Sequence, residues 1–127
     1  MTSEEQEIYK ENIIEHYKCP LNKHEMKDAT IKHRELNPLC GDDIRIFLKL
    51  KDGVIDNISF TGNGCAVSQA SISMLTEKLK GMPADMAKKI TKEDILKMLG
   101  ITISYARMKC ALLSLKVITK GIEVYEK

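Results

Sequence analysis

Three cysteines of this sequence lie at the borders of predicted helices and strands. Cys40 lies in a turn before a strand pattern, Cys65 follows a glycine-rich loop before a helix pattern, and Cys110 lies near the start of the last helix pattern. A thiol near a helix N-terminus has its pKa lowered by the helix dipole, and the thiolate is the form that binds metal or attacks sulfur. The three positions therefore suit a metal site or a site that accepts sulfur.

The neighbours of these cysteines extend the same hypothesis. Asp42 stands two residues after Cys40 and offers a carboxylate, although an acidic residue in a turn before a strand is common in any protein. The chain has no CxxC pair, so no local zinc or ferredoxin pattern supports a site. Cysteine is also among the most buried residue types. The residue types alone leave a shared site and incidental free thiols open as interpretations.

Length and composition limit the classes of protein that fit. The 127 residues are enough for one domain, 1–127, and the net charge of +2 gives no indication of nucleic-acid binding. The sequence shows no signal-peptide pattern and no apolar run long enough to span a membrane. We therefore expect a cytoplasmic protein, and in that reducing compartment cysteines are usually free, metal-bound or catalytic.

Hydrophobic periodicity predicts the elements that must position these residues. Alternation predicts strands over 44–51 and 54–60, joined by a hairpin turn at Asp52-Gly53, with a third edge strand over 29–32. Helical spacing predicts helices over 4–17, 66–80, 83–89, 91–99 and 106–125. Thr91 is expected to cap the fourth of these and Gly100 to end it. The predicted fold class is α+β, a small antiparallel three-stranded sheet with helices packed on one face.

The stretches around the cysteines resemble a known family over nearly the whole chain. They are Asn37-Pro38-Leu39-Cys40-Gly41-Asp42-Asp43-Ile44, Gly62-Asn63-Gly64-Cys65 with the Ser68-Gln69-Ala70-Ser71 that follows, and Ala106-Arg107-Met108-Lys109-Cys110-Ala111-Leu112. In this order they resemble the U-type iron–sulfur cluster assembly scaffolds, the family of IscU, SufU and the N-terminal domain of NifU. The resemblance implies a SufE/NifU-like version of the α+β fold.

The resemblance also implies roles for four residues. Cys40, Cys65 and Cys110 become persulfide acceptors and, with Asp42, the ligands of a [2Fe–2S] or [4Fe–4S] cluster or of Zn²⁺. A carboxylate is a poorer match to such a cluster than a thiolate, which would keep the centre labile. The implied partners are a cysteine desulfurase of the IscS or SufS type and recipient apo-proteins or carriers. A homodimer sharing one cluster also fits the resemblance.

Two departures from the family pattern leave the branch open. Lys109 stands where IscU-type members carry His, and residues 102–109 lack their Leu-Pro-Pro-Val-Lys chaperone motif. The motifs are closer to SufU, yet the stretch from Cys65 to Cys110 is too short for the insertion usual in SufU. The sequence therefore fits a non-enzymatic scaffold or a zinc-dependent sulfurtransferase. A purely structural zinc is a weaker third hypothesis, because structural sites usually place their ligands in local pairs.

The fourth cysteine and the three histidines are not expected to be ligands. Cys19 stands where the family has Asn, so we interpret it as an incidental free thiol. His16, His24 and His33 are far in sequence from the three cysteines, and none of them is expected to be a ligand.

Overall fold

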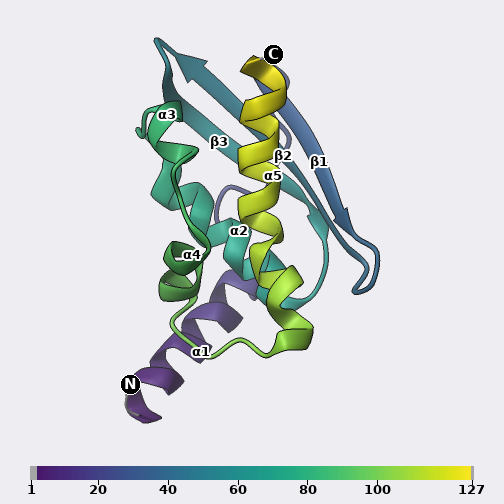
Figure 1. Cartoon of the computed structure of the whole chain (residues 1–127), viewed down its shortest axis with the longest axis vertical. Helices are drawn as coiled ribbons and strands as arrows, with labels where there is room; N and C mark the ends of the chain where they lie inside the picture. The colour runs from purple at the N-terminus through teal and green to yellow at the C-terminus, as the bar shows by residue number, and fades with distance from the viewer. Residues whose placement is uncertain (1–2, 127) are drawn as a thin grey trace.

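The computed structural model describes residues 3–126, and within them helices flank a single sheet. The elements, in chain order, are α1 (Ser3–Lys18), β1 (Ile31–Asn37), β2 (Asp42–Lys51), β3 (Val54–Asn63), α2 (Ala66–Leu79), α3 (Ala84–Ala87), α4 (Lys92–Leu99), the 3₁₀ helix η1 (Tyr105–Arg107) and α5 (Met108–Glu126). In Figure 1, α5 runs along the face of the sheet, while α3 and α4 lie beside it.

The sheet has the order β1-β2-β3, and both neighbouring pairs are antiparallel. Asp52 and Gly53 form the turn between β2 and β3, with φ of 54° and 77°. Two consecutive positive φ angles are the geometry that matches a two-residue turn to the twist of a hairpin. The predicted hairpin and the predicted α+β class are both confirmed.

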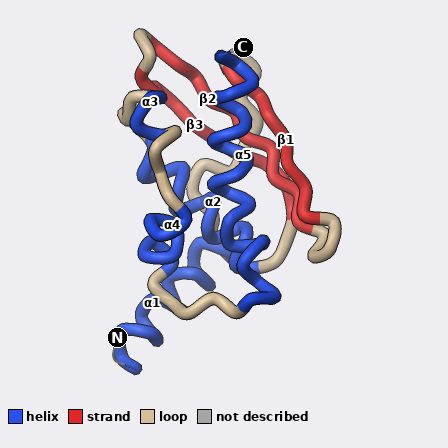
Figure 2. The backbone as a smooth tube through the Cα atoms, in the orientation of Figure 1, coloured by secondary structure: helices blue, strands red, loops and turns tan. Residues whose placement is uncertain are grey.

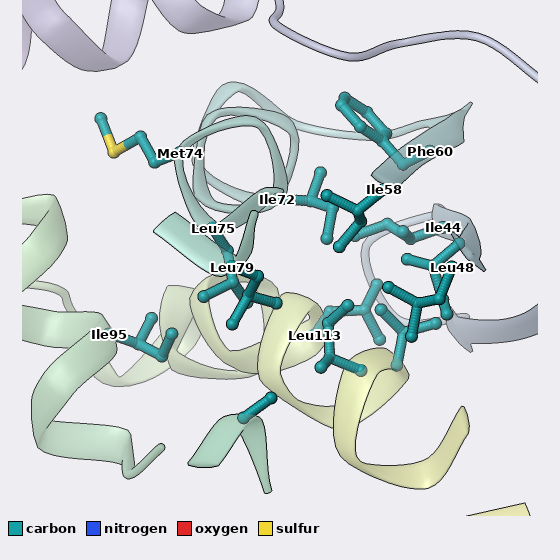
Figure 3. Close-up of a cluster of buried hydrophobic side chains, with 14 of the residues drawn as sticks. Ile44, Leu48, Ile58, Phe60, Ile72, Met74, Leu75, Leu79, Ile95 and Leu113 are labelled. Carbon is teal, nitrogen blue, oxygen red and sulfur yellow. The ribbon is translucent and has the colours of Figure 1, made fainter. Parts of the chain in front are cut away.

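The core lies between the sheet and the helices. Ile44, Ile46 and Leu48 of β2 are fully buried, which is the alternation that the sequence shows. Figure 3 shows Leu75 and Leu79 of α2 and Leu113 of α5 on the side of the strand residues Ile44, Leu48, Ile58 and Phe60, whereas Ile95 of α4 lies beyond Leu79, farther from the strands. This packing fixes where α2 and α5 begin, and two of the cysteines lie at those starts.

All three strands differ from the prediction in extent. The edge strand predicted at 29–32 is β1 over Ile31–Asn37, β2 begins at Asp42, two residues before the predicted start, and β3 continues past residue 60 to Asn63. Gly62 lies inside β3, where a Cβ would collide with the backbone carbonyl of Asp43 on β2. This glycine therefore permits close approach of two strands and does not end the strand.

The outer edge of β3 is covered by other parts of the chain. The Phe60 N–H donates to the Asn22 carbonyl at 3.0 Å, and the Ile55 N–H donates to the Met82 carbonyl at 2.9 Å. The Gly81 N–H donates back to the Ile55 carbonyl at 2.8 Å. Backbone groups at this edge are thus paired within the chain.

Three junctions meet at one end of the molecule. The turn from β1 to β2, the passage from β3 into α2 and the start of α5 lie toward the end opposite the β2–β3 turn (Figure 1). Figure 2 shows the loops at that end in tan, between the ends of the strands and the helices. None of the helices in residues 3–126 is long and apolar enough to cross a membrane.

Candidate metal and sulfur site

Cys40, Asp42 and Cys110 come together at this end of the fold. One ligand atom from each, the two sulfurs and a carboxylate oxygen, lie within 4.8 Å of one another. Cys40 is exposed, whereas Asp42 and Cys110 are buried. The group therefore has one accessible thiol in front of a buried thiol and a buried carboxylate.

The Asp42 carboxylate is held by hydrogen bonds from three segments. Its Oδ1 accepts from the backbone N–H of Cys65 at 2.9 Å and from the Ser68 hydroxyl at 3.0 Å. Its Oδ2 accepts from the side-chain amide of Asn37 at 3.3 Å. Burial alone would raise the pKa of Asp42, but these hydrogen bonds and one with Cys110 outweigh it and lower the pKa. Asp42 is thus an ionised carboxylate in a buried position.

Gly64 provides the space that this carboxylate needs. A Cβ at residue 64 would lie 2.5 Å from Asp42 Oδ1 and 2.6 Å from the Ser68 hydroxyl oxygen. Both distances are shorter than van der Waals contact. The glycine before Cys65 therefore lets the β3–α2 loop close over Asp42.

Cys65 also has a structural role in the fold. It is the N-cap of α2, and its sulfur accepts the Ser68 N–H at 3.5 Å. Its sulfur is not part of the group within 4.8 Å, yet it is near enough to affect the pKa of Cys110. Cys65 therefore lies beside the group, with its sulfur used in the cap of α2.

The Cys110 thiol differs from the sequence-based expectation. Burial raises its pKa, and hydrogen bonding with Cys40 and Asp42 and the nearby Cys65 raise it further. The helix dipole was expected to lower it, but burial outweighs that effect. Cys110 is therefore a neutral thiol in the metal-free protein, and a bound ion would displace its proton.

Arg107 is the cation at the three sulfurs. A hydrogen bond with Cys65 raises the pKa of Arg107, and the thiolate forms of Cys65, Cys110 and Cys40 would raise it further. Lys109, which stands at the family's His position, lines a groove of about 400 Å³ with Leu39 and Leu112 beside the site. Arg107 offsets part of the negative charge that three thiolates and a carboxylate would carry.

The donor set fits zinc or an iron–sulfur centre. Zinc binds thiolate sulfur at about 2.3 Å, which in a tetrahedron separates two sulfurs by about 3.8 Å. The ligand atoms of Cys40, Asp42 and Cys110 lie within 4.8 Å of one another, which is compatible with binding to one ion. Soft thiolates favour zinc and iron–sulfur clusters over hard cations such as magnesium.

The remaining candidates from the sequence lie elsewhere. His16 contacts the Ser73 hydroxyl at 2.8 Å, His33 contacts Glu35 at 2.7 Å, and His24 contacts the Glu25 carbonyl at 3.0 Å. Across the described residues, the metal-capable group contains no histidine and does not contain Cys19.

Asn37 and Ser68 are the two site residues to which the sequence pattern assigned no role. Asn37 is 6% exposed and Ser68 is fully buried, although both residue types are usually exposed. Both residues lie within the stretches that resemble the family, but a sequence motif does not show which side chains are in contact. The usable signal was the alternation Ile31, His33, Glu35, Asn37, which places Asn37 on the inward side of β1 if the strand is extended.

Two thiols and a carboxylate gathered at one end of an α+β fold form a group that could hold a metal ion. The sequence profile of the family described as NifU-like N terminal domain matches residues 8–127. The chain belongs to this family.

Curated relatives agree with that assignment, and a solved structure shares the fold. The chain is 34% identical over 132 residues to the zinc-dependent sulfurtransferase SufU of Bacillus subtilis, covering 91% of this chain and 89% of the relative. It is 33% identical over 118 residues to the iron–sulfur cluster assembly scaffold protein IscU 1 of Archaeoglobus fulgidus, covering 93% and 76%. The N-terminal NifU-like protein of Brucella abortus has the same fold, with a TM-score of 0.76 at 22% identity over 95% of this chain and 96% of that chain.

Proposed function

We propose that this protein is an iron–sulfur cluster assembly scaffold. It accepts sulfur from a cysteine desulfurase on its cysteines, builds a labile cluster on Cys40, Cys65, Cys110 and Asp42, and transfers it to apo-proteins or carriers. The observation that supports this most is the grouping of the Cys40, Asp42 and Cys110 ligand atoms within 4.8 Å. Family membership and the IscU-type relatives add to it.

Exposure makes Cys40 the first acceptor in this proposal. Its thiolate attacks the outer sulfur of the persulfide on the desulfurase cysteine. A new S–S bond forms at Cys40, the S–S bond on the desulfurase breaks, and the desulfurase cysteine leaves as a thiolate. Cys110 is buried and protonated, so it is a poor first nucleophile and a better ligand once an ion has displaced its proton.

Asp42 supplies the lability that a scaffold needs. The carboxylate is a harder ligand than thiolate and matches an iron–sulfur cluster less well. Its oxygens also accept hydrogen bonds from Cys65, Ser68 and Asn37. These hydrogen bonds compete with a metal for the lone pairs of the carboxylate. A cluster held by three cysteines and this aspartate is therefore expected to exchange more readily than one held by four cysteines.

A zinc-dependent sulfurtransferase is the second candidate. The 34% identity to SufU and Lys109 at the His position favour it. Zn²⁺ would be held by the same three cysteines and Asp42, and its role would be to keep the thiolates ionised. One cysteine released by the desulfurase would then accept the persulfide sulfur as above.

The proposal also covers the cellular compartment and the oligomeric state of the protein. Free thiols at a site of this kind require a reducing compartment, so the cytoplasmic location expected from the sequence stays a prediction. A homodimer that shares one cluster likewise stays a prediction. The exposure of Cys40 is compatible with a second chain beside the site.

The test is anaerobic reconstitution with a cysteine desulfurase, cysteine, ferrous iron and a thiol reductant, which supplies the electrons that convert persulfide sulfur to sulfide. The scaffold hypothesis predicts bound iron and acid-labile sulfide, with thiolate-to-iron absorption in the visible range. Cys40→Ala, Cys65→Ala and Cys110→Ala should each abolish this, and Cys19→Ala should not. Tight zinc binding and faster desulfurase turnover without any cluster would instead establish the sulfurtransferase. Zinc whose removal merely unfolds the protein, with no effect on the desulfurase, would contradict both.

A further inference from the structure

We propose that Asn37 is a positioning residue that holds Asp42 and Cys110 together as one pair of metal ligands. The proposal deepens the proposed function and rests on one part of it, that these two residues bind the same ion. It does not depend on whether that ion belongs to a cluster or is zinc.

Asn37 contacts all three members of the ligand group. Its side-chain nitrogen Nδ2 donates to Asp42 Oδ2 at 3.3 Å and to the Cys110 sulfur at 3.7 Å. Its backbone carbonyl accepts the Cys40 N–H at 3.2 Å, which closes the turn that carries the exposed thiol. One residue therefore connects the β1–β2 turn, the start of β2 and the start of α5.

The place of Asn37 in the sheet makes these contacts rigid. It is the last residue of β1 and pairs in register with Asp42, the first residue of β2. Its side chain is 6% exposed, so water cannot easily replace its amide. A rigid and buried donor is what orients a metal ligand from the outer shell.

The chemistry of the amide suits two acceptors at once. A carboxamide nitrogen carries two N–H bonds, and here one points to a carboxylate oxygen and one to a sulfur. When both groups bind a metal they carry negative charge, and a hydrogen bond to an ionised acceptor is stronger than one to a neutral acceptor. An aspartate at this position has no such donor when ionised, and an alanine has none at all.

The experiment measures Co²⁺ binding to the reduced, metal-free protein under anaerobic conditions. Cobalt reports its ligands directly, because thiolate ligation gives an absorption band absent from aqueous Co²⁺. We expect Asn37→Ala and Asn37→Asp each to weaken Co²⁺ binding by about 10- to 100-fold and to change the thiolate-to-cobalt band. Asn57→Ala is the matched control, since Asn57 is an exposed asparagine of β3.

A double-mutant cycle tests whether Asn37 acts through its neighbour. In the Asp42→Ala background the further change Asn37→Ala should have a clearly smaller effect on Co²⁺ affinity, because one of its two acceptors is gone. If Asn37→Ala weakened Co²⁺ binding equally in the wild-type and Asp42→Ala backgrounds, the role of Asn37 in pairing Asp42 with Cys110 would be overturned. Affinity and spectrum equal to those of Asn57→Ala would overturn the proposal as a whole.

Stability must be separated from positioning. Urea unfolding of each metal-free variant shows how much Asn37 contributes to the fold, and Asn37→Asp preserves the volume of the side chain. A purely structural residue would lower the free energy of unfolding and leave the Co²⁺ spectrum of the folded protein unchanged, which would also overturn the proposal. Failure of the wild-type protein to accept persulfide, with these cobalt results intact, would refute the proposed function alone.

Discussion

The Asp42 carboxylate oxygen Oδ1 accepts the backbone N–H of Cys65 at 2.9 Å. This bond joins the first residue of β2 to the N-cap of α2. Asp42 therefore links two cysteine-bearing segments of the chain while it also stands among the candidate ligands. Substitutions of Asp42 and of its neighbours should have separable effects on folding and on the bound centre.

The first prediction concerns the space around this bond. Gly64→Ala would place a methyl group 2.5 Å from Asp42 Oδ1, so the carboxylate or the loop must move. Crowding of this kind costs about 1–3 kcal/mol of unfolding free energy. We expect that loss in urea unfolding of the metal-free protein, together with weaker Zn²⁺ or Co²⁺ binding in a chelator competition.

Gly81→Ala is the control for that substitution. Gly81 has φ of 80° and no atom within 4 Å of an added Cβ, so alanine there introduces backbone strain without crowding. It should cost about 1–2 kcal/mol of stability and leave metal affinity unchanged. Equal metal affinity of Gly64→Ala and Gly81→Ala would show that Gly64 does not shape the site.

The second prediction concerns the lifetime of a reconstituted cluster. Asp42→Ala removes the hard ligand and leaves three thiolates, so we expect the visible absorption of the cluster to decay several times more slowly in the presence of a chelator. Asp56→Ala, at an exposed position of β3, is the control and should decay like the wild type. Faster decay in Asp42→Ala would mean that the carboxylate stabilises the cluster.

The third prediction concerns pH. The pKa of Asp42 is lowered below its ordinary value of 3.8, so its ionised form favours the folded state. This contribution is complete above the ordinary pKa and is lost as pH falls through the lowered pKa of the folded state. Asp42→Asn should therefore be less stable than the wild type at neutral pH, with the difference narrowing below pH 3.8. Denaturant unfolding of the metal-free proteins between pH 3 and 7 measures this, and a gap that widens on acidification would refute it.

The fourth prediction concerns the order in which the thiols react. Cys19 and Cys40 are exposed, whereas Cys110 is buried with a raised pKa. Iodoacetamide at neutral pH should therefore modify Cys110 more than about tenfold more slowly than Cys40, as followed by peptide mass spectrometry. Bound Zn²⁺ should protect Cys40, Cys65 and Cys110 and leave Cys19 reactive. Protection of Cys19 to the same degree would place it at the site.

The sequence predicted best those features that depend on local signals. The Asp52-Gly53 hairpin needs two residues that tolerate positive φ, and both have it. Thr91 caps α4 through a capping box with Asp94, and Gly100 ends that helix with φ of 71°, as expected. Each of these features depends on residues within one turn of one another.

β1 was predicted at the wrong extent because its inward side is polar. His33 and Glu35 face α5, where they pair at 2.7 Å and Lys116 approaches Glu35 at 3.4 Å. Gly121 of α5 lies against His33, so that the helix comes close to the strand. An apolar alternation could not reveal this strand, since its burial depends on partners about eighty residues away in sequence.

Three of the four candidate site residues lie together in the structure, and their arrangement was not predictable from the sequence. The sequence indicated Cys40, Asp42, Cys65 and Cys110, and the structure brings Cys40, Asp42 and Cys110 together. The Cys65 cap of α2 is a contact with Ser68, three residues later, but cysteine is not among the usual N-cap residues. The raised pKa of Cys110 could not be predicted, because it follows from how distant segments bury the thiol. The role of all four candidate residues as ligands stays a prediction.

The covered edge of β3 has a consequence for how this protein behaves at high concentration. Residues 22–23 and 81–83 pair with that edge, so β1 is the edge of the described sheet where a foreign strand could add. Lys32 and Arg34 are exposed on β1, and charges at an edge oppose such addition. Fibril-like self-association through the edges of the sheet is therefore opposed at both of them.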